Sequence, residues 1–299
     1  MPGRTRPTRA TELTAGRAAG PRPSGGGSAA RTRRLLVVGL LCAATLPGCG
    51  GRAPAPHVGY QRHSAEKTYG DCSGPRDSDR CTRIRLRWPT VTSAPTPAGA
   101  DSIRAFVRAL LCKPYDGGAP LPNEDSVMVG FIDAFRAFAS RVPGGPTSSW
   151  QFERRIEPLG DTLGVASLAI TEEAFLGGAH PNSTTAFANF DVASGRMLRL
   201  SDLLLDSGRE QLDQVGERAF RRVRKLSAGI DLNAAGFWFE RGEFKLNENF
   251  AVTPTGMLFF FNAYEVGPYS FGATSLRLPW AEVMPLIRTD GPLAGHGGR

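Results

Sequence analysis

Helical and strand-like segments follow one another in separate blocks along this chain, and that order constrains its fold more than any other feature. Two amphipathic windows lie within residues 101–138, strand-like runs fill 150–200, a third helix begins near residue 207, strands return over 250–278, and a short helix closes at 280–287. A regular alternation of strand and helix would instead favour a parallel sheet. We therefore expect an α+β fold, an antiparallel sheet with two N-terminal helices and one central helix packed on it.

The first strand-like segment, residues 83–88, alternates strictly between arginine and apolar residues. Ile84, Leu86 and Trp88 share one face, and three arginines share the other. This period of two predicts a strand with one face in a core. The arginine row could bind an anionic polymer, but a solvated strand face is the commoner arrangement and the one we favour. Pro89 should end this strand or place it at a sheet edge.

Two helices are predicted next, each with one apolar face. Asp101 or Ser102 could cap the first helix. Its apolar face consists of Ile103, Phe106, Val107, Leu110 and Leu111, and that of the second of Met128, Phe131, Ile132, Phe135 and Phe138. The second stripe is rich in aromatic residues and could line a lipid or cofactor groove. At helical spacing beside strands, we interpret it as core.

The third helix and the hairpin before it have recognisable local signals. Ser207 and Glu210 have the spacing of a capping box. The loop 191–196, between strand-like runs at 184–190 and 197–200, contains a glycine and predicts a hairpin.

The N-terminal region has the parts of a secretory signal. Arginines at 31, 33 and 34 precede the apolar run Leu35–Leu46, which is 12 residues long, whereas a bilayer crossing needs roughly 20. The run ends in Leu46-Pro47-Gly48-Cys49, which resembles the bacterial lipobox, where the peptide is cut before the cysteine and the thiol is acylated. We predict lipidation of Cys49 and therefore a lipoprotein anchored in a membrane. An ordinary cleaved signal peptide and an uncleaved membrane anchor are the alternatives.

The formal charge of +8 is concentrated in this N-terminal region. Residues 1–49 hold eight arginines and one acidic residue, so the rest of the chain carries a net charge of only +1. A nearly neutral exported chain gives no electrostatic reason to expect nucleic acid as a partner.

The cysteines agree with export to an oxidising compartment. Apart from Cys42 and Cys49, the chain has Cys72, Cys81 and Cys112. The close pair Cys72–Cys81 is the bridge we favour, which leaves Cys112 as a free thiol; Cys81–Cys112 is the competing connectivity. A zinc site would need a CxxC spacing or a neighbouring histidine, and neither is present.

His180 is the one histidine expected in the ordered region. With Glu172, Glu173 or Asp191 nearby, it could serve as a general base or a single metal ligand. However, the sequence contains no Gly-x-Ser-x-Gly, no phosphate-binding glycine loop and no HExxH. We expect a binding protein without a cofactor, not an enzyme, with His180 fixing its loop.

Several segments together resemble one bacterial extracytoplasmic family, a domain of unknown function. They are Gly177–Asn182, Asn189–Asp191, Ser194–Arg196, Leu200–Leu203, Gly256–Phe261, Tyr264–Glu265 and Pro268–Gly272. This domain forms the outer part of the lysozyme-sensing anti-sigma factor and accompanies the catalytic domain of a peptidoglycan deacetylase. The resemblance extends over roughly residues 81–288 and implies a module that recognises a protein at the cell surface.

The chain departs from the sensor in ways that disfavour direct signalling. It shows no membrane span, and the 34 residues before Leu35 are too few for a sigma-binding domain. Lysozyme is strongly basic and would favour an acidic receptor, so the nearly neutral mature chain weakly disfavours lysozyme as the ligand.

These observations divide the chain into five parts. They are a lipoprotein signal peptide (1–49), a flexible tether (50–80), an N-terminal α+β subdomain (81–195), a C-terminal sensor-like subdomain (196–288) and a loose tail (289–299).

The function that we expect is that of a lipid-anchored cell-envelope protein, facing outside the cytoplasm, that recognises a protein or a cell-wall component. Its expected partner surface comprises His180, Asn182, Glu265 and Tyr269, which lie in turns rich in Gly, Pro and aromatic residues. The alternatives are an accessory or catalytic subunit of a peptidoglycan hydrolase or deacetylase, and a structural lipoprotein without a specific ligand.

Overall fold

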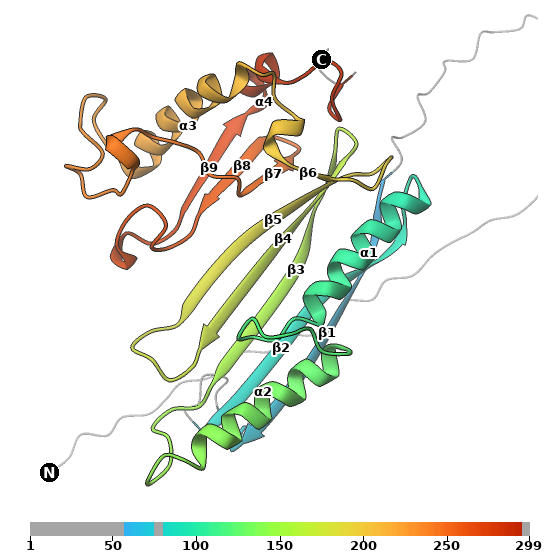
Figure 1. Cartoon of the computed structure of the whole chain (residues 1–299), viewed down its shortest axis with the longest axis vertical. Helices are drawn as coiled ribbons and strands as arrows, with labels where there is room; N and C mark the ends of the chain where they lie inside the picture. The colour runs from blue at the N-terminus through green and yellow to red at the C-terminus, as the bar shows by residue number, and fades with distance from the viewer. Residues whose placement is uncertain (1–56, 75–79, 295–299) are drawn as a thin grey trace, which may run out of the picture. The chain divides into compact units, whose positions relative to one another are not determined.

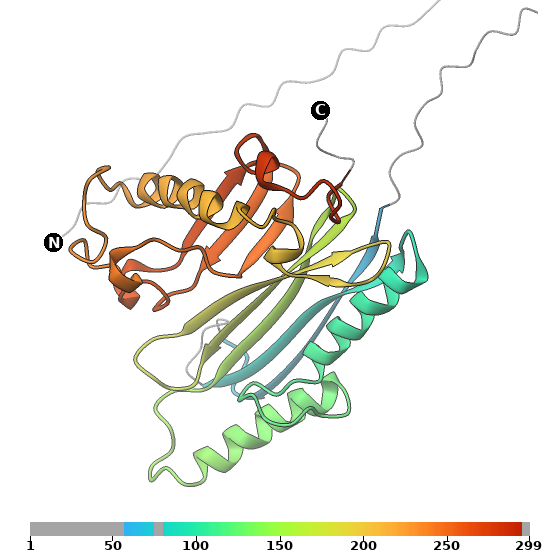
Figure 2. The same cartoon turned by 45° about the horizontal axis from the view of Figure 1, so that its top comes forward.

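The computed structural model describes residues 57–74 and 80–294, which belong to one compact unit. Cys49 and the predicted signal peptide lie outside the described residues. The fold is of the mixed α+β class, with a six-stranded sheet, a three-stranded sheet and four α-helices in the described residues (Figures 1 and 2). Within the same residues, no helix has the length and apolar character needed to cross a membrane.

The six-stranded sheet follows the order of the chain. Its strands are β1 (Gly59–Gly70), β2 (Cys81–Ser93), β3 (Gln151–Thr162), β4 (Val165–Phe175), β5 (Asn182–Asp191) and β6 (Met197–Leu198). Neighbours are antiparallel except β2 and β3, which run parallel. This pair differs from the antiparallel sheet expected from the sequence, because two helices between β2 and β3 return the chain to the end from which β2 began.

Strand β1 lies in the segment expected to be a flexible tether. It pairs with β2 along its whole length, from Gly59 opposite Ser93 to Gly70 opposite Cys81. The Asp161 carboxylate fixes the two residues that precede this strand. It accepts hydrogen bonds of 2.8 Å from the Val58 amide and from Nδ1 of His57. Ordered structure therefore begins before Cys81.

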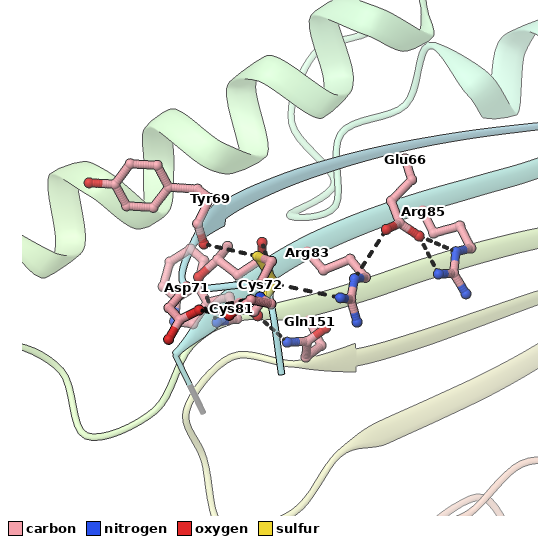
Figure 3. The surroundings of a disulfide bond; sticks show 11 residues. Glu66, Tyr69, Asp71, Cys72, Cys81, Arg83, Arg85 and Gln151 are labelled. Atoms are coloured by element: carbon pink, nitrogen blue, oxygen red, sulfur yellow. Dashed lines mark hydrogen bonds and ion pairs between the residues drawn. A yellow bond between two sulfur atoms is a disulfide. The ribbon is translucent and has the colours of Figure 1, made fainter. Parts of the chain in front are cut away.

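Strand β2 has the alternation predicted for it. Ile84 and Leu86 are fully buried, whereas Arg83 and Arg85 both form ion pairs with Glu66 of β1 (Figure 3). The arginine row is therefore an ion-paired sheet face. Pro89 does not end the strand, but it lies beyond Arg87, the last β2 residue paired with β3, so its missing N–H costs no ladder bond on that side.

Helices α1 (Pro97–Leu111) and α2 (Glu124–Ala139) cover one face of this sheet (Figure 1). The cap of α1 is Thr96, whose Oγ1 accepts a 3.0 Å bond from the Gly99 amide, and not Asp101 or Ser102. The aromatic stripe of α2 enters the core as predicted at Phe131, which is fully buried. Phe138, the last residue of the stripe, is 39% exposed and stacks on Trp150.

The second sheet contains β7 (Phe250–Thr253), β8 (Gly256–Phe261) and β9 (Thr274–Pro279) in that order. Helix α3 (Gly208–Arg224) packs against it, and α4 (Trp280–Val283) follows β9. The predicted capping box at the start of α3 is absent, because Ser207 is in the αR conformation and its side chain makes no cap bond. Of the tail expected over 289–299, the described part ends at residue 294 and includes Leu293, which is buried at 1% exposure.

Side chains join the two sheets by capping the strand edges that face each other. In the small sheet, backbone groups of β7 bond to Ser167 of β4 and Asn189 of β5. In the large sheet, the backbone of Thr185 in β5 bonds to the side chains of Asn249 and Asn262. Each sheet therefore supplies amides or hydroxyls where the other lacks a neighbouring strand.

The predicted Cys72–Cys81 disulfide is confirmed. It joins the residues after β1 to the first residue of β2, with a Cα–Cα distance of 4.8 Å (Figure 3). The loop that it closes is short, so the chain-entropy model gives a stabilisation of about 2–3 kcal/mol. Among the described cysteines, Cys112 has the free thiol.

Candidate functional site

Two loops that the sequence singled out, residues 177–182 and 264–272, meet in the structure. The His180 and Tyr269 rings stack with centroids 3.9 Å apart and an interplanar angle of 18°. The Tyr269 hydroxyl also donates a 3.1 Å hydrogen bond to the Pro181 carbonyl. The loop between β4 and β5 is thus attached directly to the loop between β8 and β9.

A third ring extends this stack. Tyr264 lies with its ring centroid 5.3 Å from that of Tyr269. Tyr264 is 52% exposed and Tyr269 is 37% exposed, although both are large rings. We call His180, Tyr264 and Tyr269 the aromatic patch.

Tyr264 has a strained backbone. Its φ is +68°, in the left-handed region that non-glycine residues rarely adopt. Such strain persists only where the surroundings fix the chain, and it is frequent at functional sites. Here it accompanies a largely exposed ring.

Glu265 fixes the turn that carries Tyr264. One carboxylate oxygen accepts a 2.8 Å bond from the Asn262 amide, and the other accepts a 2.6 Å bond from the Asn247 side chain. Because Asn262 also bonds to Thr185 of β5, the turn is connected to the large sheet. The structure thus gives Glu265, which the sequence analysis assigned to the partner surface, a positioning role.

Arg224, in the last turn of α3, holds the other end of this loop. Its guanidinium donates to the carbonyls of Phe271 at 2.7 Å and Gly272 at 3.1 Å. Burial lowers the pKa of this guanidinium from its ordinary value, yet an arginine stays charged at neutral pH. The aromatic patch therefore stands on a loop that is anchored on both sides.

The chemistry open to His180 follows from its contacts. Nδ1 lies 2.9 Å from the Pro181 carbonyl, which can only accept, so Nδ1 carries the proton. The carboxylates considered as its partners are engaged elsewhere, since Glu172 pairs with Arg154 and Glu173 with Arg155. Asp191 accepts from Ser194 in the β5–β6 hairpin. In the described part of the chain, no group of three or more His, Cys, Asp or Glu side chains could hold a metal ion.

The remaining residue of the expected surface, Asn182, is the first residue of β5. It pairs with Ala174 of β4 and is exposed. It thus follows the loop that carries His180, and its side chain is open to solvent.

Comparison with known protein families agrees with part of the resemblance drawn from the sequence. A family model described as "Protein of unknown function (DUF3298)" matches residues 201–281. The chain contains a DUF3298 domain. The match begins at the residues before α3 and ends in α4, so it includes Tyr264 and Tyr269 but not His180. It is narrower than the 81–288 range expected from the sequence. No curated protein matches this chain.

Solved structures of DUF3298 proteins share the fold over a larger part of the chain. One, from Bacteroides fragilis, superposes with a TM-score of 0.62 at 17% identity and covers 81% of this chain and 97% of its own. Another, from Pseudomonas aeruginosa, has a TM-score of 0.58 at 18% identity and covers 79% of this chain and 96% of its own. At these identities the similarity is one of fold.

Both loops of the aromatic patch carry recognisable sequence patterns, but not all residues of the patch do. The expected partner surface included both His180 and Tyr269, whose rings are in contact. Tyr264 was named only as part of the segment Tyr264–Glu265 that carries the family resemblance and was not placed on the partner surface, whereas its ring is exposed. The positive φ of Tyr264 accompanies the hydrogen bond between Glu265 and the Asn262 backbone amide. No local sequence pattern predicts it.

Proposed function

We propose that this chain is a lipid-anchored binding protein of the bacterial cell envelope, which recognises a protein or a cell-wall component through the aromatic patch. One observation carries the proposal: exposed rings are stacked on loops that polar bonds hold rigid. Tyr is enriched at binding hot spots, because it offers a large contact area with little conformational freedom to lose. The resemblance to the extracytoplasmic part of an anti-sigma factor and to a deacetylase-associated domain supports the same class of function.

The anchor is tested by replacing the predicted lipidation site. Cys49→Ala should abolish incorporation of labelled fatty acid and release the protein from the membrane fraction, because acylation needs the thiol. Cys42→Ala, which changes a cysteine within the predicted signal peptide, is the matched control and should leave labelling intact. Wild-type protein without a labelled lipid would contradict the lipoprotein assignment.

The aromatic patch is tested by truncating its most exposed ring. Tyr264→Ala should weaken capture of envelope protein or purified peptidoglycan by the full chain by about thirtyfold, since a central hot-spot ring contributes about 2 kcal/mol or more. The melting temperature of the variant should stay close to that of the wild type, because the Tyr264 ring is largely exposed and its one ring contact is with Tyr269 in the described residues.

Met197→Ala is a suitable control for this experiment. Met197 is 50% exposed and lies in β6, which pairs near the end of β5 remote from Asn182. The control should bind like the wild type. If Tyr264→Ala also binds like the wild type, the aromatic patch serves the fold and the binding site lies elsewhere.

A further inference from the structure

The two outer edges of the six-stranded sheet differ in whether their backbone groups have hydrogen-bond partners. At the β5 side, β6 pairs with Asn189 and Phe190, and the side chains of Asn249 and Asn262 bond to further backbone groups of β5. At the other side, β1 is the terminal strand over twelve residues. Among the described residues, no group outside the sheet bonds to the backbone of residues 61–68. Unpaired edges of this length are templates for another strand.

The edge strand is also regular. Its one register shift lies between Gly59 and Tyr60, and pairing with β2 is continuous from Tyr60 to Gly70. Bulges and prolines, which usually protect an edge, are absent from residues 61–70. A partner strand could therefore add along about ten residues without a break.

We propose that β1 pairs with β1 of a second copy of this chain, antiparallel about a two-fold axis at Ser64. A two-fold axis between antiparallel strands is perpendicular to the sheet, so each residue faces a partner residue on the same side of the sheet. With the axis at Ser64, Arg62 lies opposite Glu66 of the second copy, and the same pair recurs across the axis. The two copies form one continuous sheet.

Charge complementarity selects this register. Moving the axis to His63 places Arg62 opposite Ser64 and Glu66 opposite Tyr60, and moving it to Ala65 places Arg62 opposite Thr68. Neither of these neighbouring registers forms an Arg–Glu pair. Opposite charges directly across a strand pair are stabilising. In the described part of a single chain, Arg62 has no ion pair, whereas Glu66 pairs with Arg83 and Arg85. The second copy thus supplies the carboxylate that Arg62 lacks.

A cysteine at the axis tests the register. In the proposed dimer the two Ser64 Cα atoms are about 4.5 or 5.5 Å apart, within the range that a disulfide spans. Ser64→Cys, in a full-length chain whose Cys42, Cys49 and Cys112 are replaced by serine, should therefore form a covalent dimer under mild oxidation. Gln61→Cys in the same background should not, because residue 61 faces Lys67 of the second copy.

Mixing provides a second readout of the same geometry. Gln61→Cys and Lys67→Cys chains should cross-link to each other but not to themselves. If Ser64→Cys cross-links no better than Gln61→Cys alone, the proposed pairing is wrong.

A charge reversal tests the Arg–Glu pair without disturbing the fold. Arg62→Glu places two carboxylates opposite each other, so sedimentation should show a dissociation constant raised at least tenfold relative to the wild-type dimer. Arg222→Glu makes the same charge change at an exposed site on α3 and should leave the dimer intact. The proposal is overturned if the wild-type chain is still monomeric at a protein concentration of about 100 μM. It is also overturned if Arg62→Glu leaves the dissociation constant of the dimer unchanged.

Discussion

At the scale of single residues, Tyr60 is the group whose ionisation the fold perturbs most clearly. Its hydroxyl is buried and has no partner among the described residues. Burial, and then the charge of Asp161, raises its pKa from 10.0 to about 12. The folded protein therefore keeps this proton at a pH where the unfolded chain has lost it. The resulting stabilisation is complete below pH 10 and is lost as the pH rises towards 12.

Tyr60→Phe should change the pH dependence of stability more than stability itself. At pH 7 the free energy of unfolding should stay the same or rise by up to about 1 kcal/mol, because no hydrogen bond is lost and an unpaired buried hydroxyl is removed. In urea unfolding between pH 10 and 12, the alkaline loss of stability should be smaller than in the wild type. Tyr264→Phe, with an exposed ring, is the control. A loss above about 1 kcal/mol at pH 7 would show that the hydroxyl has a partner.

At the scale of elements, local patterns identified helices and strands where one face is apolar. The alternation around Ile84 and the helical stripe containing Phe131 each correctly predicted residues that are fully buried in the structure. Strand β1 was missed because it lies at an edge and has exposed polar residues such as Gln61 and Arg62. A strand with little apolar alternation resembles a loop in sequence. The Thr96 cap was missed because Asp101 and Ser102 are equally suitable residue types, and tertiary contact decides between them.

How the strands and loops pair with one another was harder to predict from the sequence than the strands and helices themselves. The parallel contact between β2 and β3 joins segments separated by two helices, and no periodicity reports it. The disulfide was predictable, since Cys72 and Cys81 are nine residues apart and bracket a turn-rich segment. Only the two loops of the aromatic patch could be predicted from the sequence. The stack of His180 on Tyr269 forms because the loop between β4 and β5 meets the loop between β8 and β9, which are far apart in the chain.

At the scale of the whole molecule, the joint between the sheets depends on a few buried polar side chains. Asn189 is 2% exposed and Ser167 is fully buried. The Asn189 side chain donates a 2.8 Å bond to the Phe250 carbonyl and accepts a 3.1 Å bond from the Val252 amide. Ser167 donates to Asn189 and also lies within bonding distance of the Val252 carbonyl. This side-chain network replaces the backbone ladder that two sheets in contact cannot form.

Removing Asn189 should therefore destabilise the molecule as a whole. Asn189→Ala leaves the Phe250 carbonyl without this partner in a buried site and leaves the Val252 amide with only its 3.2 Å bond to Ser167 Oγ. An unsatisfied buried group costs about 1–3 kcal/mol. We expect the free energy of unfolding to fall by about 2–4 kcal/mol in denaturant titrations of the purified chain. Asn233→Ala, at an exposed position, should change it by less than about 0.5 kcal/mol. If instead Asn189→Ala costs no more than Asn233→Ala, the sheets are held together by apolar packing, and the polar joint only sets their register.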